Sequence, residues 1–281
     1  MSVKITSDST CDLSPELIEQ LEIGILPLTV VLDDQGRLDG QEISPSDIFR
    51  HVDAGGELPT TSAVSVAEYL DAFTALRAQY DEVIHINLGS GFSACYQNAC
   101  LAAQELEGVY PVDSQNLSSG QGHVVVAAAQ AAKAGKTAAE ICSMLEDLIP
   151  RVEASFIIDR LDYMVKGGRC SAVTMLGANL LRLKPCIEVK NGAMGVVKKY
   201  RGSFEKCLQA YVKDRLEGRD DIVTDRIFIT HPACPHSDVE LTRSEIEKYQ
   251  RFSAVTETHA GCTVSCHCGP RTLGILFLRS K

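Results

Sequence analysis

The sequence lacks an apolar run long enough to cross a bilayer, and it has little positive charge. No stretch of roughly 18 apolar residues occurs in the 281-residue chain, whereas a membrane-spanning helix needs about 20. Lys and Arg number 27 against 37 Asp and Glu, which gives a net charge of -10. Such a chain is repelled by nucleic-acid phosphates and by anionic membrane surfaces. Since no secretory leader pattern is present either, we expect a soluble cytoplasmic protein that binds no nucleic acid.

The sequence also lacks the cysteine spacing of a disulfide framework. Its 11 cysteines are an odd number in a chain of ordinary size, which favours a reduced cytoplasm. Three cysteines and two histidines gather near residue 265 without a Cys-x-x-Cys pair, and this spacing matches no standard zinc pattern. We therefore expect no metal, with a structural zinc module as a minor alternative. The five residues are His259, Cys262, Cys266, His267 and Cys268.

Strand and helix patterns alternate through residues 1–153. This alternation predicts right-handed βαβ units and an α/β domain with a mainly parallel sheet. The predicted strands are Val3–Thr6, Ile23–Leu32, Asp81–Leu88 and Gly108–Val112. The predicted helices are Pro15–Leu21, a short helix capped by Ser44, Ser65–Gln79, Ser93–Leu106, Leu117–Ala134 and Thr137–Ile149.

The pattern changes over residues 154–281, for which we predict a second α/β domain with a mixed sheet. An Asn-Gly turn at Asn191 and Gly192 indicates a hairpin, which requires antiparallel strands. The predicted strands are Ala154–Ile158, Cys186–Val189, Met194–Lys198, Arg226–Thr230, Ala254–Thr258 and Leu273–Leu278. The predicted helices are Ser171–Leu181, Ser203–Leu216 and Asp238–Tyr249.

The most informative stretch is the turn Gly89–Ser93 between a predicted strand and a predicted helix. A helix start leaves backbone N–H groups unpaired and carries partial positive charge, so it can hold a phosphate or a carboxylate. The hydroxyls of Ser90 and Ser93 can add donors. The turn lacks the full glycine fingerprint of a dinucleotide site and the lysine of a P-loop. On these residues alone, a tight turn with a capped helix is the alternative.

Two further polar clusters are candidates for ligand binding. Thr60–Ser62 places three hydroxyl residues before a capped helix, and hydroxyls donate to an anion without adding charge. A solvated loop is the alternative. Asp8 and Asp12 follow the first strand, where open α/β sheets bind ligands. Capping of turns is the alternative for these two carboxylates.

The order and spacing of these motifs resemble those of the DegV family, bacterial proteins that bind fatty acids. Each motif is modest alone, but together they span nearly the whole chain. The matching segments are Thr6–Leu13, Pro59–Ser62, Gly89–Ser93, Asp113-Ser114, Leu161–Tyr163, Lys166–Arg169 and His267–Pro270.

The resemblance implies a two-domain α/β protein that holds a long-chain free fatty acid in a buried tunnel and presents its carboxylate to a partner fatty acid kinase. The chain is then a carrier and not an enzyme, with no cofactor of its own and with transient membrane contact. The family's carboxylate-binding hydroxyls map onto Thr61 and Ser93. The supporting headgroup residues are Ser62, Ala94, Arg169 and His267. An apolar run can line the tail pocket, with core packing as the alternative: Met175, Leu176, Leu180 and Leu181.

The chain departs from the family pattern at two places. Ser93-Ala94-Cys95 stands where the family usually has Ser-Gly-Thr, although Ala94 keeps its N–H. Arg271 stands where the family usually has the second glycine of Gly-Pro-Gly. This bulky side chain raises a question about either the local turn or the surface that meets the partner.

A serine hydrolase of an acyl ester is the alternative function. Ser93 would be the nucleophile, His267 the base and Asp113 the orienting carboxylate, which are suitable residue types for a triad. The sequence around Ser93 lacks the final glycine of a Gly-x-Ser-x-Gly elbow. The carrier therefore remains the leading hypothesis.

Overall fold

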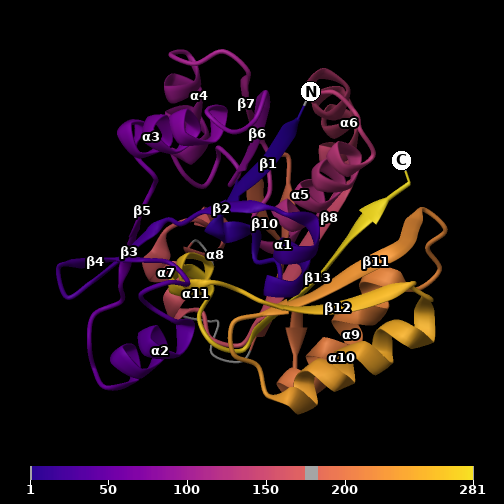
Figure 1. Cartoon of the computed structure of the whole chain (residues 1–281). Helices are drawn as coiled ribbons and strands as arrows, with labels where there is room; N and C mark the ends of the chain where they lie inside the picture. Colours follow the sequence, from indigo (N-terminus) through magenta and orange to yellow (C-terminus); the bar gives the residue numbers. More distant parts are fainter. Residues whose placement is uncertain (1, 175–182, 281) are drawn as a thin grey trace.

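The computed structural model describes residues 2–174 and 183–280, and its strands form three sheets (Figure 1). The predicted helix Ser171–Leu181 is described only at α8 (Ser171–Thr174). The four apolar residues predicted to line a tail pocket lie outside the described residues: Met175, Leu176, Leu180 and Leu181.

The first sheet is parallel throughout, as the alternating pattern predicts. Its strand order is β2-β1-β6-β7, and each neighbouring pair is parallel. All six residues of β6 are buried, because alternate side chains face opposite helical layers. Ile84 and Ile86 pack with α5 and α6, whereas Val83 packs with α3 and α4. The bounds are β1 (Val3–Asp8), β2 (Gly24–Leu26), β6 (Glu82–Asn87), β7 (Val109–Asp113), α1 (Pro15–Leu21), α3 (Val66–Arg77), α4 (Cys95–Ala103), α5 (Ser118–Lys133) and α6 (Ala138–Leu148).

The second sheet is mixed, with strand order β10-β9-β8-β13-β11-β12. Only β11 and β12 pair in parallel, and the other neighbours are antiparallel. Helices α9 and α10 cover one face, and α5 packs against the other (Figure 1). The bounds are β8 (Val152–Ile158), β9 (Leu183–Lys190), β10 (Ala193–Arg201), β11 (Ile222–His231), β12 (Ala254–His259), β13 (Thr272–Arg279), α9 (Phe204–Leu216) and α10 (His236–Tyr249).

The α/β fold with a parallel and a mixed sheet is confirmed, but one predicted strand is wrong. The predicted strand Ile23–Leu32 is two strands, β2 in the first sheet and β3 (Thr29–Leu32) in a third sheet of order β4-β3-β5. Pro27 lies between them, and its missing N–H interrupts a strand ladder. Strand β5 (Thr60–Ser62) pairs with β3, although we expected a loop there. Strand β4 (Gln35–Leu38) completes this sheet.

The cysteine-rich segment forms a helix, α11 (Cys262–Cys268), which the sequence did not predict. Asp39 accepts hydrogen bonds from the backbone N–H groups of Cys262 at 2.7 Å and Thr263 at 3.0 Å, so a distant carboxylate caps the helix start. Cys262 and Cys266 are buried in a cluster with residues of α2 (Pro45–Asp53) and α7 (Asp162–Gly167). They are core residues of this cluster, and their thiols do not converge with a histidine in the described structure.

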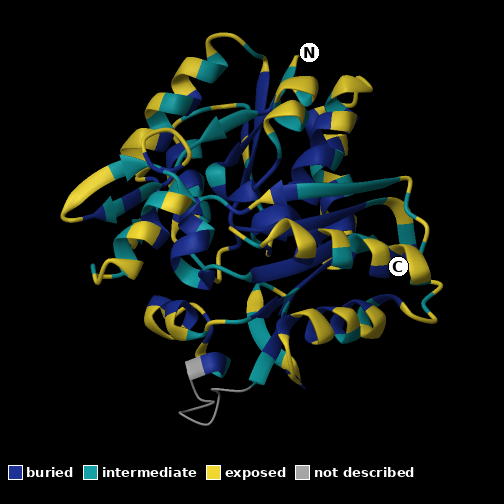
Figure 2. Cartoon of the chain, turned by 90° about the horizontal axis from the view of Figure 1, so that it is seen from below, coloured by how far each residue is buried: buried dark blue, intermediate teal, exposed yellow. Residues whose placement is uncertain are grey.

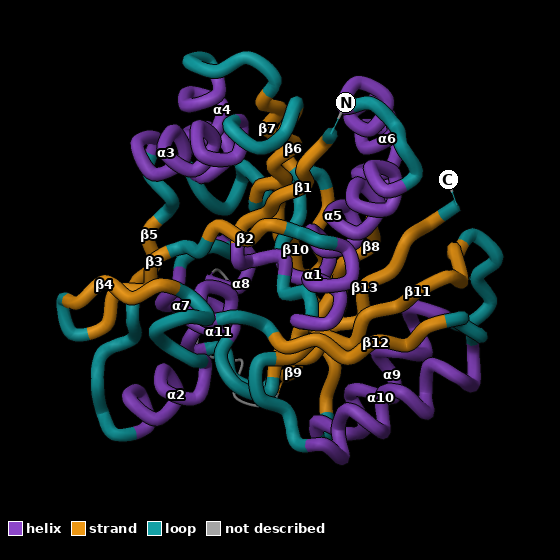
Figure 3. The backbone as a smooth tube through the Cα atoms, in the orientation of Figure 1, coloured by secondary structure: helices purple, strands orange, loops and turns teal. Residues whose placement is uncertain are grey.

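Most strands run through the middle of the molecule, and most helices lie on either side of them (Figure 3). Buried residues concentrate on the strands and on the inner faces of the helices, while exposed residues lie on the outer helix faces and the turns (Figure 2). Short 3-10 helices η1 (Ser9–Cys11) and η2 (Ile149–Arg151) complete the described elements. No helix within residues 2–174 and 183–280 has the length and apolar character needed to span a bilayer.

Candidate functional site

One cavity of about 300 Å³ brings together all six residues of the predicted headgroup site. Its volume lies at the lower end of the range typical of small-molecule sites. The six residues come from β5, the turn before α4, the segment after α7, and α11. They are Thr61, Ser62, Ser93, Ala94, Arg169 and His267.

The cavity runs from the protein surface into an apolar interior. At the headgroup end, Ser62, Ala94 and Arg169 are exposed, and Thr61, Ser93 and His267 are half-buried. The remaining wall is mainly apolar and comes from strands of the mixed sheet and from loops and helices that pack against it. Its buried residues include Leu28, Leu88, Ala154, Met164, Val189 and Leu276. A ligand that fits this cavity therefore has a polar end near solvent and an apolar body inside the protein.

Thr61 and His267 form a hydrogen-bonded pair at the mouth of the cavity. His267 Nε2 lies 3.0 Å from Thr61 Oγ1. The tautomer of the ring decides which of the two atoms donates. In the tautomer that carries the proton on Nε2, this atom donates to Thr61. Thr61 then keeps its own hydroxyl proton for an anion. Burial, and next the charge of Arg169, lower the pKa of His267 to about 4, so the ring is neutral at pH 7.

The backbone of Gly167 fixes the position of the His267 ring. A Cβ at Gly167 would lie 2.6 Å from His267 Nδ1, which is closer than real Cβ contacts. The carbonyl oxygen of Gly167 also accepts a hydrogen bond from Arg169 Nη1 at 2.8 Å. One glycine thus places both the neutral histidine and the cationic arginine at the mouth of the cavity.

The Ser93 hydroxyl donates its proton only in a weak hydrogen bond to sulfur. Its Oγ accepts from the Cys95 backbone N–H at 3.2 Å and donates to Cys95 Sγ at 3.1 Å. Sulfur is a weak acceptor, so this proton can be redirected to a ligand at small cost. Burial raises the pKa of Cys95 to about 11, which keeps the sulfur as a thiol. In the described structure no acceptor takes up the Ala94 N–H, so the Ala94-Cys95 departure preserves the donors of this turn.

Two aspartates stabilise the Gly89–Ser93 turn by accepting hydrogen bonds from it and from the residue before it. Asp8 is fully buried and accepts from the Leu88 N–H and from the Tyr69 hydroxyl, the latter at 2.9 Å. Asp113 accepts from the Ser90 N–H at 3.0 Å and from the Ser90 hydroxyl. Asp8 therefore supports the turn and does not line the cavity. The expectation that Ser90 donates to an anion is wrong, because its hydroxyl is already bound to Asp113.

The Asn191-Gly192 hairpin turn contacts the Gly89–Ser93 turn from the other half of the chain. A Cβ at Gly91 would lie 2.1 Å from the carbonyl oxygen of Gly192. Only glycine permits this approach. The hairpin of β9 and β10 thus packs directly on the turn that carries Ser93, and Met194 of the same hairpin lines the cavity.

The structure does not assemble the triad of the hydrolase alternative. The three groups have different partners: Ser93 Oγ bonds with Cys95, His267 Nε2 with Thr61, and Asp113 with Ser90 and the Gln115 N–H. Among the described residues no hydrogen bond joins Ser93 to His267 or His267 to Asp113. A nucleophile without its base is not activated.

Arg271 lies away from the cavity and serves the mixed sheet and its helices. Its backbone φ of 53° is in the left-handed region that glycine usually occupies. Its guanidinium pairs with Glu205 at 3.0 Å and Asp238 at 3.1 Å and lies over the ring of Phe204 at 4.8 Å. The turn therefore tolerates Arg271, whose side chain joins the starts of α9 and α10.

Several cavity residues were not predicted from the sequence. Ser118 and Thr230 supply polar wall atoms, and Phe156 supplies an apolar one. Their patterns are those of ordinary strands and helix starts, so they carry no signal of ligand contact. Asp12, predicted as a ligand-site candidate, bonds instead to Ser118 and to the Gly261 N–H at 2.8 Å.

The sequence and the fold match a known family over almost the whole chain. A family model described as "Uncharacterised protein, DegV family" matches residues 2–280. A DegV domain-containing protein of Listeria monocytogenes is 33% identical over 281 residues, which cover 98% of each chain. A Thermotoga maritima protein named fatty acid-binding protein is 29% identical over 281 residues, which cover 98% of this chain and 96% of its own.

A solved structure shows the same architecture. It is a DegV family protein of Thermus thermophilus, described by its fatty acid binding. It is 27% identical, covers 99% of this chain and 100% of its own, and superposes with a TM-score of 0.90. These matches confirm the DegV-like fold that the motifs predict. The chain belongs to the DegV family.

Proposed function

We propose that this protein binds a long-chain free fatty acid, with the acyl tail in the apolar interior and the carboxylate at Thr61 and Ser93. The observation that carries the proposal is a single cavity with hydroxyl donors at its exposed end and buried apolar walls beyond them. The fatty acid binding described for the relatives from Thermotoga maritima and Thermus thermophilus supports it.

The energetics of such a ligand suit the two ends of the cavity. Burial of roughly fourteen methylenes contributes on the order of 11 kcal/mol before other costs, and loss of motion offsets a large part of it. A carboxylate is costly to bury without donors. Thr61 Oγ1–H, Ser93 Oγ–H and the Ala94 N–H provide neutral donors, and Arg169 adds a charge-assisted one.

The proposal extends to a carrier role. The headgroup end is open to solvent, and a carboxylate held there is within reach of a second protein. In this proposal a separate fatty acid kinase phosphorylates the bound carboxylate in the cytoplasm. The protein itself performs no chemistry and takes its lipid cargo during transient contact with a membrane. Ser62, Ala94 and Arg169 form the rim that the kinase meets.

The test is the lipid content of the purified protein. Solvent extraction and mass spectrometry should recover a fatty acid from the wild type. The double variant Thr61→Ala/Ser93→Ala should lose it, because the carboxylate then lacks both hydroxyl donors. Thr60→Ala/Thr74→Ala is the matched control, since both residues are exposed threonines outside the cavity.

Unchanged lipid loading in the Thr61→Ala/Ser93→Ala variant would refute the headgroup site, and no lipid in the wild type would refute the ligand class. The kinase step has its own measurement. Loaded wild type should yield acyl phosphate with ATP and a purified bacterial fatty acid kinase, and the double variant should not. Wild type that carries lipid but yields no acyl phosphate contradicts the carrier role alone.

A further inference from the structure

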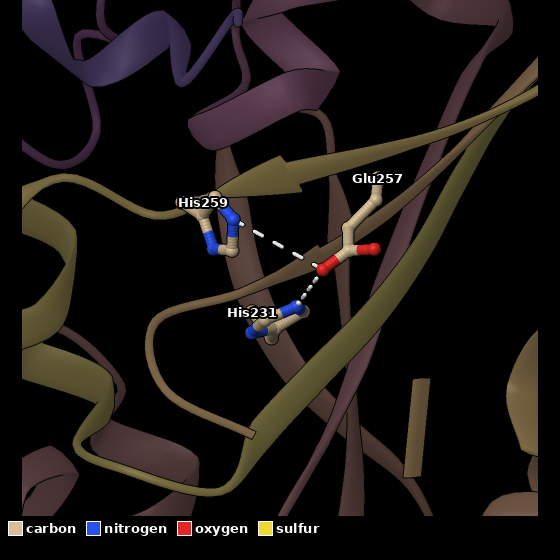
Figure 4. A group of neighbouring side chains, drawn as sticks. All are labelled: His231, Glu257 and His259. Carbon is tan, nitrogen blue, oxygen red and sulfur yellow. Dashed lines mark hydrogen bonds and ion pairs between the residues drawn. The ribbon is translucent and has the colours of Figure 1, made fainter. Parts of the chain in front are cut away.

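A cluster of two histidines and one glutamate lies where strands β11 and β12 end (Figure 4). The two strands are parallel, and His231 is in register with His259. Glu257 precedes His259 by two residues, so both side chains project from the same face of β12. The register therefore gathers three potential ligands at one edge of the mixed sheet.

The distances within the cluster are close to those of a metal site. Glu257 Oε1 lies 3.0 Å from His231 Nε2 and 4.0 Å from His259 Nε2. The three ligand atoms all lie within 4.8 Å of one another. In four-coordinate zinc sites, bonds of about 2.0–2.2 Å place neighbouring ligand atoms about 3.3 Å apart. The largest distance between two ligand atoms therefore has to shorten by about 1.5 Å when a metal ion binds.

One of the three side chains is buried in the protein, and the other two are open to solvent, from which an ion can enter. The His231 side chain is 4% exposed and fixed in the wall of the cavity. The Glu257 side chain is 32% exposed, and that of His259 is 68% exposed. His259 can therefore move toward a bound ion, and the ion reaches the cluster from solvent on that side.

We infer that His231, Glu257 and His259 form a binding site for a divalent transition-metal ion such as Zn²⁺. Two imidazoles and one carboxylate are the ligand set of open zinc sites, in which a water molecule takes the fourth position. The inference is independent of fatty acid binding. It also differs from the cysteine and histidine pattern in the sequence, because His259 joins His231 and Glu257 and none of the cysteines.

Two contacts lower the affinity that this site can reach. The backbone N–H of Cys234 donates to His231 Nδ1 at 3.2 Å, so a metal ion on Nε2 shifts the ring proton to Nδ1 and leaves that N–H without its acceptor. Arg243 Nη2 lies 3.9 Å from Glu257 Oε2 and competes for the carboxylate. Oε1 still faces the histidines. We therefore expect an ion that exchanges with chelators, unlike that of a closed structural site.

The experiment uses the full-length protein stripped with a chelator and titrated with Co²⁺. One Co²⁺ per chain should bind, with visible d–d bands, without a thiolate charge-transfer band, and with displacement by Zn²⁺. Glu257→Gln and His259→Ala should each weaken binding by about tenfold or more. Zn²⁺ should also raise the melting temperature of the wild type and not that of either variant.

His236→Ala and Glu247→Gln are the matched controls, since both residues are exposed on α10. Both control variants should bind Co²⁺ as the wild type does. Circular dichroism of each metal-free variant verifies folding, and the exposed His259 gives a substitution that leaves the core intact. Three results would each overturn the inference: no Co²⁺ bound by the folded wild type, binding unchanged in both site variants, or a thiolate band that assigns the ion to cysteines.

Discussion

At the scale of single residues, His267 combines a half-buried ring with a hydrogen bond to Thr61, a candidate ligand-binding hydroxyl. A buried imidazole without a carboxylate partner favours the neutral form, because the charged form loses its hydration. This lowers the pKa of His267 to about 4 from its ordinary value of 6.5. A neutral His267 keeps Thr61 oriented and adds no charge at neutral pH. The histidine therefore titrates only under acidic conditions.

The low pKa of His267 predicts an acid-sensitive contribution to stability. The unfolded chain takes up a proton near pH 6.5 and the folded chain only near pH 4, so the contribution is complete above pH 6.5 and is lost as the pH falls toward 4. Between pH 7.5 and 5 the wild type should lose on the order of 2 kcal/mol relative to His267→Gln. Urea unfolding of both proteins at the two pH values measures this difference. A constant difference would show that His267 titrates normally.

The sequence predicts candidate site residues that the structure gathers at one cavity, but it does not predict their hydrogen-bond partners. Thr61 and Ser93 stand in motifs that resemble a family pattern, and their hydroxyls suit a carboxylate. The Thr61–His267 bond joins residues 206 positions apart, and no local pattern reports such a contact. The sulfur acceptor of Ser93 is likewise a product of packing, because Cys95 is a common buried residue in any core.

At the scale of elements, the predictions hold where periodicity is strong and fail where tertiary contacts decide. The run Asp81–Leu88 is apolar enough to predict β6 at the centre of a parallel sheet. Helix α11 is different, because its cysteines, threonine and valine have low helix propensity. Asp39 caps it from 223 positions away, and burial of Cys262 and Cys266 stabilises it. Tertiary context therefore overrides local preference there.

The contact between the β9–β10 hairpin and the Ser93 turn predicts a sensitive position at Gly91. Gly91→Ala places a methyl group against the Gly192 carbonyl and forces the two turns apart, and such overpacking costs about 1–3 kcal/mol. Gly195→Ala, in the same hairpin, meets no atom within 4 Å and is the control. Thermal melting and displacement of a fluorescent fatty acid measure both effects. Equal melting temperatures for the two variants would contradict the contact.

At the scale of the whole molecule, the two predicted domains share one apolar core. Ile84 of the parallel sheet belongs to the same buried cluster as Phe228 and Leu276 of the mixed sheet. His123 of α5 also bonds to the Leu276 carbonyl oxygen at 3.0 Å. The predicted boundary at residue 153 lies within the first two residues of β8, which belongs to the mixed sheet. As a boundary between independent domains it stays a prediction.

The shared core predicts that the first half does not fold alone. A fragment of residues 1–153 exposes the face of α5 that packs on the mixed sheet, including His123, whose ring contacts that of Phe228. We expect it to lack a cooperative thermal transition and to bind a hydrophobic dye, because a large apolar surface stays in water. A fragment with a sharp transition would instead establish two independent folding units.

The pairing of Thr61 with a residue near the end of the chain has a consequence for synthesis. Ribosomes make the chain from its first residue onward, so Thr61 and Ser93 emerge long before α11 exists. The Thr61–His267 hydrogen bond at the proposed carboxylate site forms only once residue 267 has left the ribosomal exit tunnel and packed against β5. In the proposed function, a nascent chain therefore lacks the complete carboxylate site until its translation is finished.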